Sequence, residues 1–277
     1  DVAIPAESAD AAHDWRALDR VLAELRPKAM AAGLYLPQLP REHGGLGLSW
    51  VERAVILEEA GRSFLAPAAM NCAPPDQPNM ISLMRQGSEA QKERYLMPLT
   101  QGKIRSCFAM TEPHPGAGSD PSMLKTFATR TANGWSINGH KWFITGASGA
   151  HFAIVLAMTE DGPTQFIVET SHPGYQLVRT IDAMDPYAIG GHGELLLRDC
   201  HVEADAVLGE VGQGLKYAQV RLEPARLSHC MRFISRSCIM FSTPSATTRN
   251  PRVFAICTMA SQSSLPCSRL PMDCTKD

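Results

Sequence analysis

The pattern of apolar residues changes after Ile104, and this change constrains the fold of the 277-residue chain more than any other feature. Before that point, apolar residues recur at the spacing of amphipathic helices. Two helix starts carry a capping box, formed by Ser49 with Glu52 and by Ser88 with Gln91. We therefore expect an all-α domain over residues 1–105. Its predicted helices cover residues 14–32, 50–61, 79–85 and 89–96.

After Ile104 the chain breaks into short segments rich in β-branched and aromatic residues, with turn signals between them. The turn signals are Asn133–Gly134, Asn138–Gly139, Asp161–Gly162–Pro163 and Pro173–Gly174. Even spacing of this kind is typical of an antiparallel sandwich or barrel. We predict a central β domain over residues 106–213. A helical pattern returns over residues 214–233 and predicts the first helix of an incomplete carboxy-terminal α domain, which makes the fold class α+β and multidomain.

Residues 234–277 differ in composition from everything before them. They are dense in Ser, Thr, Cys and Pro, and they show no sustained helical or strand period. Such a composition does not favour a packed core. We expect an atypical segment, which is either a disordered tail or the product of a change of reading frame.

Charge and composition argue against several classes of protein. The formal net charge of −2 gives no reason to expect binding to nucleic acid or to an anionic membrane. No apolar run approaches the roughly 20 residues of a membrane span. The eight cysteines form no C-x-x-C pair, and no Cys and His have the spacing of a zinc site, so no metal site is predicted. We expect an intracellular protein with reduced thiols at Cys72, Cys107, Cys200 and Cys230.

The segment Cys107–Asp120 is the strongest candidate for a ligand site. Its apolar start, Cys107–Met110, indicates the end of a buried strand, and Thr, Glu, Pro, Gly and Ser follow. Such a loop offers free backbone N–H groups and little side-chain bulk to a flat, polar, anionic ligand. An ordinary junction between a strand and a turn explains the same composition. The residues alone leave both interpretations open.

Other motifs are incomplete. Gly146–Ala150 lacks the last glycine of a nucleophile elbow, and Ser122–Lys125 matches S-x-x-K without its partner motifs. No complete G-x-G-x-x-G motif is present, which argues against a Rossmann NAD domain. His192 lies between glycines and is interpreted as a turn residue rather than a ligand.

Several linked motifs, in order along residues 15–232, resemble the acyl-CoA dehydrogenase family. Residues 111–120 carry its Thr-Glu-Pro and Gly-x-Gly-Ser-Asp elements. Leu39–Gly47 is similar to its P-E-x-G-G-x-G turn, and Ile137–Thr145 to its I-N-G-x-K-x-W-I-T hairpin. Gln91–Leu96 and Gly102–Met110 are similar to the segment that leads into its first signature, and Val207–Leu215 to the link into its carboxy-terminal helices.

The resemblance implies FAD-dependent α,β-dehydrogenation of an acyl-CoA thioester. A carboxylate removes the α-proton and the β-hydrogen leaves as hydride to flavin N5. The implied partners are acyl-CoA, electron-transfer flavoprotein as electron acceptor and, for the full-length protein, further copies in a homodimer or homotetramer. The implied setting is fatty acid β-oxidation, in the cytoplasm of a bacterium or in the mitochondria or peroxisomes of a eukaryote.

The same resemblance assigns roles to individual residues. Those implied to line the isoalloxazine ring are Phe108, Met110 and Thr111, with Phe143, Ile144 and Thr145 from the second motif. Within this set Phe143 takes the place of the ring-covering aromatic residue, and the Thr145 hydroxyl lies near N5. Gly118 and Ser119 are implied to face the pyrophosphate, with Ser119 also near the acyl-CoA. Arg226 is implied to lie near the thioester and the CoA arm.

The chain departs from the family pattern in three places. His114–Pro115 lengthen the loop after Glu112. The family base usually lies in the last helices, which this chain lacks, or in some members beside the helix arginine, where this chain has Ala225 and Glu223 lies nearby. Glu223 is therefore a candidate base or a solvated helix carboxylate. The missing helices also usually supply FAD contacts across a dimer interface. The alternatives to a dehydrogenase are a non-catalytic remnant that binds acyl-CoA or a partner, and a flavin-dependent acyl-CoA oxidase or monooxygenase.

Overall fold

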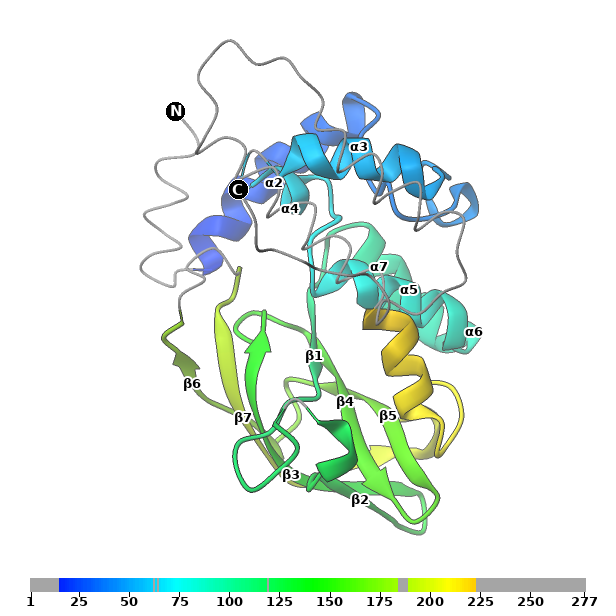
Figure 1. The fold of residues 1–277 in the computed structure, drawn as a ribbon, viewed down its shortest axis with the longest axis vertical. Coiled ribbons are helices and arrows are strands. Elements are labelled where there is room, and N and C mark those ends of the chain that lie inside the picture. The colour runs from blue at the N-terminus through cyan, green and yellow to red at the C-terminus, as the bar shows by residue number, and fades with distance from the viewer. Residues whose placement is uncertain (1–14, 62, 64, 119, 184–188, 223–277) are drawn as a thin grey trace, which may run out of the picture.

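The computed structural model describes residues 15–61, 63, 65–118, 120–183 and 189–222. Figure 1 shows a helical unit at one end and a β unit at the other, joined by β1 (Ser106–Ala109). A last helix over residues 214–222, gold in Figure 1, follows the β unit. The predicted order of a helical unit, a β unit and a helix is confirmed. Among the described residues, no helix is both long and apolar enough to cross a membrane.

The helical unit consists of helices joined by short turns. They are α2 (Trp15–Ala31), η1 (Arg41–His43), α3 (Trp50–Ala60), α4 (Ala66–Ala69), α5 (Asp76–Gln86), α6 (Glu89–Gln91), the π-helical η2 (Lys92–Leu96) and α7 (Met97–Thr100). Both predicted capping boxes are present, at Ser49 and at Ser88. The helix predicted over residues 89–96 continues through the π-helical turn to Thr100. The helix predicted from residue 79 begins earlier, at Asp76.

The β unit is one curled seven-stranded sheet. After β1 come β2 (Phe127–Arg130), β3 (Gly134–Thr145), β4 (Phe152–Thr159), β5 (Gly162–Glu169), β6 (Tyr175–Ile181) and β7 (His192–Glu203). The strand order is β1-β4-β2-β3-β7-β6, and β5 pairs with β4. Short 3-10 turns, η3 (Pro121–Met123) and η4 (Ala204–Ala206), lie in the loops. The predicted central β domain is confirmed, but its sheet is mixed rather than antiparallel throughout, because β1 and β2 both run parallel to β4.

The predicted turn at Asn138–Gly139 is also wrong, because β3 runs without interruption from Gly134 to Thr145. The register of β3 and β7 shifts at this point, with Ile137 opposite Cys200 and Gly139 opposite Leu197. Gly139 is needed for packing rather than for a turn, since an added Cβ would collide with the side chain of Thr126. The dipeptide that predicts a hairpin therefore lies opposite a β-bulge in β7, where Arg198 and Asp199 oppose Asn138.

The two units share apolar contacts through β4, which is buried on both faces. Phe152 and Ile154 pack into a cluster with Met80 and Leu83 of α5. Ala153, Val155 and Ala157 point to the other face and pack inside the curled sheet. The period of two along a strand explains this division. Three of the cysteines predicted to be reduced, Cys72, Cys107 and Cys200, are buried, and Cys107 and Cys200 are free thiols. Cys230 lies outside the described residues.

Candidate functional site

The end of β1 and the end of β3 lie side by side, although about thirty residues separate them in the chain. The backbone N–H of Trp142 donates to the carbonyl oxygen of Thr111 at 3.1 Å. This bond brings the segment Phe108–Thr111 next to Phe143–Thr145. The two motifs singled out in the sequence therefore meet at one place in the fold.

A buried ion pair fixes this junction. Lys141 Nζ lies 2.9 Å from Glu112 Oε1, and both side chains are almost completely inaccessible to solvent. The ammonium also donates to the carbonyl oxygens of Met110 and Leu156, at 3.0 and 2.8 Å, so each of its three protons has an acceptor. Burial lowers the pKa of Lys141 to about 8, against the opposing charge of Glu112. Lys141 is therefore mainly an ammonium at neutral pH.

Glu112 also organises the loop that follows it. Its carboxylate accepts hydrogen bonds from the backbone N–H groups of Ala117, Lys125 and Thr126, at 3.1, 2.7 and 2.9 Å. Its carbonyl oxygen accepts from the N–H of Gly118 at 3.0 Å. Burial alone would raise the pKa of Glu112, but the charge of Lys141 and the donated hydrogen bonds outweigh it and hold the pKa at about 2. The glycine-rich loop is thus folded back onto an ionised carboxylate.

A β-bulge in β3 explains why Phe143 faces outward. Lys141 pairs with Leu195 and Ile144 pairs with Gly193, so two residues of β3 lie opposite one residue of β7. The extra residue lets both Lys141 and Ile144 point inward, which a regular period of two would not allow. Phe143 takes up the distortion with φ of 51°, and its side chain is 45% exposed. The bulge therefore presents an aromatic ring to the surface beside Thr111.

Thr145 has a partner that the sequence did not predict. Its Oγ1 lies 3.1 Å from Nδ1 of His192, the first residue of β7. The two residues face each other across the β3–β7 ladder. His192 belongs to a strand and contacts a predicted site residue, so its interpretation as a turn residue is wrong. No sequence signal links the two residues, because only the strand register brings them together.

On the other side of the junction, the buried guanidinium of Arg221 lies over the ring of Phe108. The guanidinium carbon of Arg221, on the helix over residues 214–222, lies 3.9 Å from the centre of the Phe108 ring. Arg221 Nε donates to Asn79 Oδ1 at 2.7 Å, and Asn79 Nδ2 donates to Ser106 Oγ at 2.9 Å. Burial lowers the pKa of Arg221 to about 9. These contacts tie the last described helix to α5 and β1.

The remaining predicted site residues lie as follows. Met110 and Thr111 are half-buried on the segment that continues β1. Ile144 packs in the core of the β unit, so its side chain points away from the surface that carries Phe143. Gly118 has φ of 52° and open space where a Cβ would lie. Ser119, Glu223 and Arg226 lie outside the described residues.

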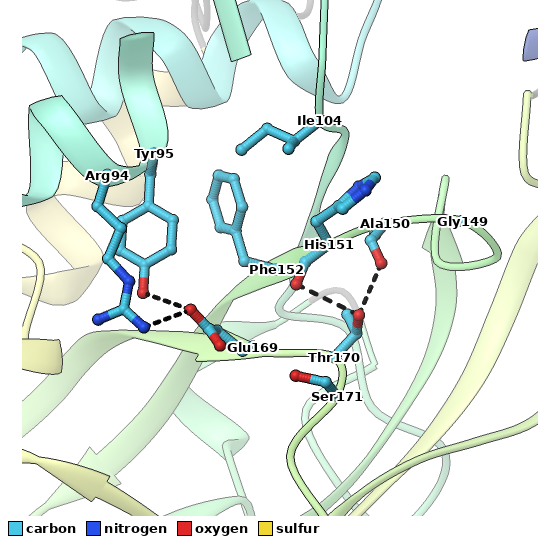
Figure 2. Close-up of a pocket in the computed structure, with 10 residues that line it drawn as sticks. All are labelled: Arg94, Tyr95, Ile104, Gly149, Ala150, His151, Phe152, Glu169, Thr170 and Ser171. Carbon is cyan, nitrogen blue, oxygen red and sulfur yellow. Dashed lines mark hydrogen bonds and ion pairs between the residues drawn. The ribbon is translucent and has the colours of Figure 1, made fainter. Parts of the chain in front are cut away.

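A separate pocket of about 450 Å³ lies between η2 and the ends of β4 and β5 (Figure 2). Arg94 and Tyr95 reach from η2 to Glu169, with Oε1 at 2.7 Å from Arg94 Nη2 and 3.3 Å from the Tyr95 hydroxyl. The rings of Tyr95 and Phe152 lie 4.9 Å apart. No residue that lines this pocket is a predicted site residue, so we assign it no role in the site.

Two family models match the chain. The model for the acyl-CoA dehydrogenase N-terminal domain matches residues 4–103, and the model for the acyl-CoA dehydrogenase middle domain matches residues 107–200. Acyl-CoA dehydrogenase family member 10 of Mus musculus is 37% identical over 233 residues, 78% of this chain and 22% of the mouse protein. Family member 11 of Homo sapiens is 37% identical over 227 residues, 77% of this chain and 28% of the human protein. The chain thus spans less than a third of either relative.

Solved structures share the same fold. An acyl-CoA dehydrogenase of Bacillus anthracis complexed with FAD is 28% identical, with a TM-score of 0.71 over 84% of this chain and 39% of that chain. Butyryl-CoA dehydrogenase of Megasphaera elsdenii is 26% identical, with a TM-score of 0.69 over 94% of this chain and 71% of that chain.

Proposed function

We propose that this chain, which belongs to the acyl-CoA dehydrogenase family, binds FAD and serves the α,β-dehydrogenation of an acyl-CoA thioester. The observation that supports the proposal is the junction of β1 and β3, where the N–H of Trp142 donates to the carbonyl oxygen of Thr111 and so joins the two motifs predicted to bind the flavin. The same FAD-dependent fold occurs in the Bacillus anthracis enzyme, which was solved with FAD.

The described residues fit a flat ring with an apolar face and a polar edge. The exposed ring of Phe143 and the half-buried side chain of Met110 offer apolar surface, and the hydroxyls of Thr111 and Thr145 offer polar contacts. The open space at Gly118 leaves room for a bulky anionic group close to the backbone. Phe143, Met110 and the two threonines therefore suit the isoalloxazine ring, and the space at Gly118 suits the pyrophosphate.

In this proposal the chain's residues position and shield the groups that react. FAD, when bound, supplies the hydride acceptor. The ion pair of Glu112 and Lys141 holds the loop that would face the pyrophosphate, and Phe143 covers the ring against solvent. Thr111 and Thr145 orient the ring through its polar edge. Fixing these groups before the substrate binds lowers the cost of ordering them during the reaction.

The proton abstraction and the partners extend the proposal beyond the described residues. We retain Glu223 as the candidate base for the α-proton and Arg226 as the contact of the thioester and the CoA arm. Ser119 is retained for the pyrophosphate and the acyl-CoA. We also propose electron-transfer flavoprotein as the electron acceptor and a homodimer or homotetramer as the assembly.

The test is a flavin spectrum of the purified 277-residue chain before and after addition of acyl-CoAs of several chain lengths. We expect the visible flavin bands, and we expect at least one acyl-CoA to bleach them. Phe143→Ala should weaken FAD binding, whereas Val55→Ala, at an exposed position of α3, should leave it unchanged. A chain that retains no flavin contradicts the proposal. Retained flavin that no acyl-CoA bleaches favours a binding remnant, and rapid reoxidation by oxygen favours an oxidase.

A further inference from the structure

The contact between Thr145 and His192 is held in place by the backbone around it. Thr145 and His192 are direct partners in the β3–β7 ladder, and His192 also pairs with Ile181 of β6. Just before His192, the carbonyl oxygens of Gly190 and Gly191 accept hydrogen bonds from the N–H groups of Ser148 and Gly146, at 3.2 and 2.8 Å. The chain on both sides of the contact is thus fixed, and the 3.1 Å separation of Oγ1 and Nδ1 follows from strand pairing.

A threonine hydroxyl has one proton and two lone pairs, and it rotates to suit its neighbours. A hydrogen bond to an imidazole nitrogen uses one of these positions and fixes the direction of the others. A ligand on the open side of Thr145 then meets a hydroxyl with a defined orientation. This matters for a flavin, because N5 accepts a hydrogen bond when the ring is oxidised and donates one when it is reduced.

We infer that His192 is a positioning residue of the flavin site, which acts by fixing the orientation of the Thr145 hydroxyl toward the ring. The inference rests on the proposed function, since it assigns a ligand to Thr145. It adds a residue from β7 to a site that the sequence motifs place on β1 and β3 alone. It also predicts that His192 influences the flavin only through Thr145.

The test is a double-mutant cycle on the full chain with His192→Phe, Thr145→Val and the combined variant. The readouts are the FAD dissociation constant, from quenching of flavin fluorescence, and the midpoint potential of the bound flavin. His192→Phe should weaken FAD binding by roughly threefold to tenfold, the range of one hydrogen bond, and should shift the potential. In the Thr145→Val background the same change should have no further effect. His192→Asn, which keeps a polar atom near the place of Nδ1, should restore most of the affinity.

The matched control is His140→Phe. His140 lies on the same strand pair, and its Nε2 bonds Glu194 Oε1 at 2.8 Å, so this change removes a similar bond away from Thr145. It should alter neither readout. The melting temperature of the flavin-free variants checks the fold, and His192→Ala replaces the Phe variant if the larger ring disturbs it.

Two results overturn the inference while leaving the proposed function intact. One is that His192→Phe changes neither the FAD dissociation constant nor the midpoint potential of the bound flavin. The other is an effect of His192→Phe that is equally large with and without Thr145. A wild-type chain that binds no flavin overturns the proposed function, and the inference falls with it.

Discussion

Replacing Glu112 by Gln tests whether the buried ion pair stabilises the site. The change keeps the size of the side chain but removes its charge, so it leaves the ammonium of Lys141 buried without its partner. Breaking one half of a buried ion pair destabilises a protein by about 3–5 kcal/mol. The lowered pKa of Glu112 gives a similar value. A fall of this pKa from 4.5 to about 2 corresponds to about 3 kcal/mol of folding free energy. We expect Glu112→Gln to lower the free energy of unfolding by about 3 kcal/mol at pH 7.

The pH dependence of this effect has a definite sign. The pKa of Glu112 is lower in the folded than in the unfolded chain, so its contribution to stability is complete above about pH 4.5. That contribution is lost as the pH falls from about 4.5 toward 2, where the folded carboxyl takes up its proton. The difference in unfolding free energy between the wild type and Glu112→Gln should therefore shrink over this window.

The assay is urea unfolding followed by circular dichroism at a series of pH values between 2 and 7. The control is Asp161→Asn, which breaks the exposed pair with Arg130, whose atoms lie 3.4 Å apart. Exposed pairs contribute only about 0–1 kcal/mol, so this change should have little effect. The reasoning is refuted if Glu112→Gln costs no more than the control, or if its effect does not depend on pH below 4.5.

Three other substitutions test the neighbouring structure. Arg221→Met removes the bond to Asn79 and should lower the free energy of unfolding by about 1–3 kcal/mol, measured in urea; an unchanged midpoint would contradict the role of Arg221 in holding the last helix. Gly139→Ala should destabilise by about 1–3 kcal/mol, and Thr126→Ala should recover part of the loss in the same assay, since the two side chains compete for space. Phe143→Gly should leave the melting temperature unchanged or slightly raised, because it relieves a positive φ, while it weakens FAD binding. A large fall in its melting temperature would show that the ring stabilises the fold.

Local interactions explain why the helix starts and the strand segments could be predicted. The capping boxes at Ser49 and Ser88 use residues three positions apart. The apolar run Cys107–Met110 was expected to end a buried strand, and β1 covers it except for Met110. Where a local signal was misleading, a distant contact decided the outcome. Asn138–Gly139 is typical of a hairpin turn, but pairing with β7 keeps β3 extended, and Asn138 bonds the backbone N–H of Asp199 at 2.9 Å.

The two motifs of the candidate site and their order in the chain were therefore determined by the sequence itself, because each motif is a short run of residues with its own local conformation. Only the tertiary structure decided how they combine. The pairing of Glu112 with Lys141, the outward turn of Phe143 at the bulge and the contact of Thr145 with His192 all join residues far apart in the chain. Each depends on strand register, which moves every side chain to the other face when it slips by one residue. No local pattern specifies that register, since it results from the packing of the whole sheet.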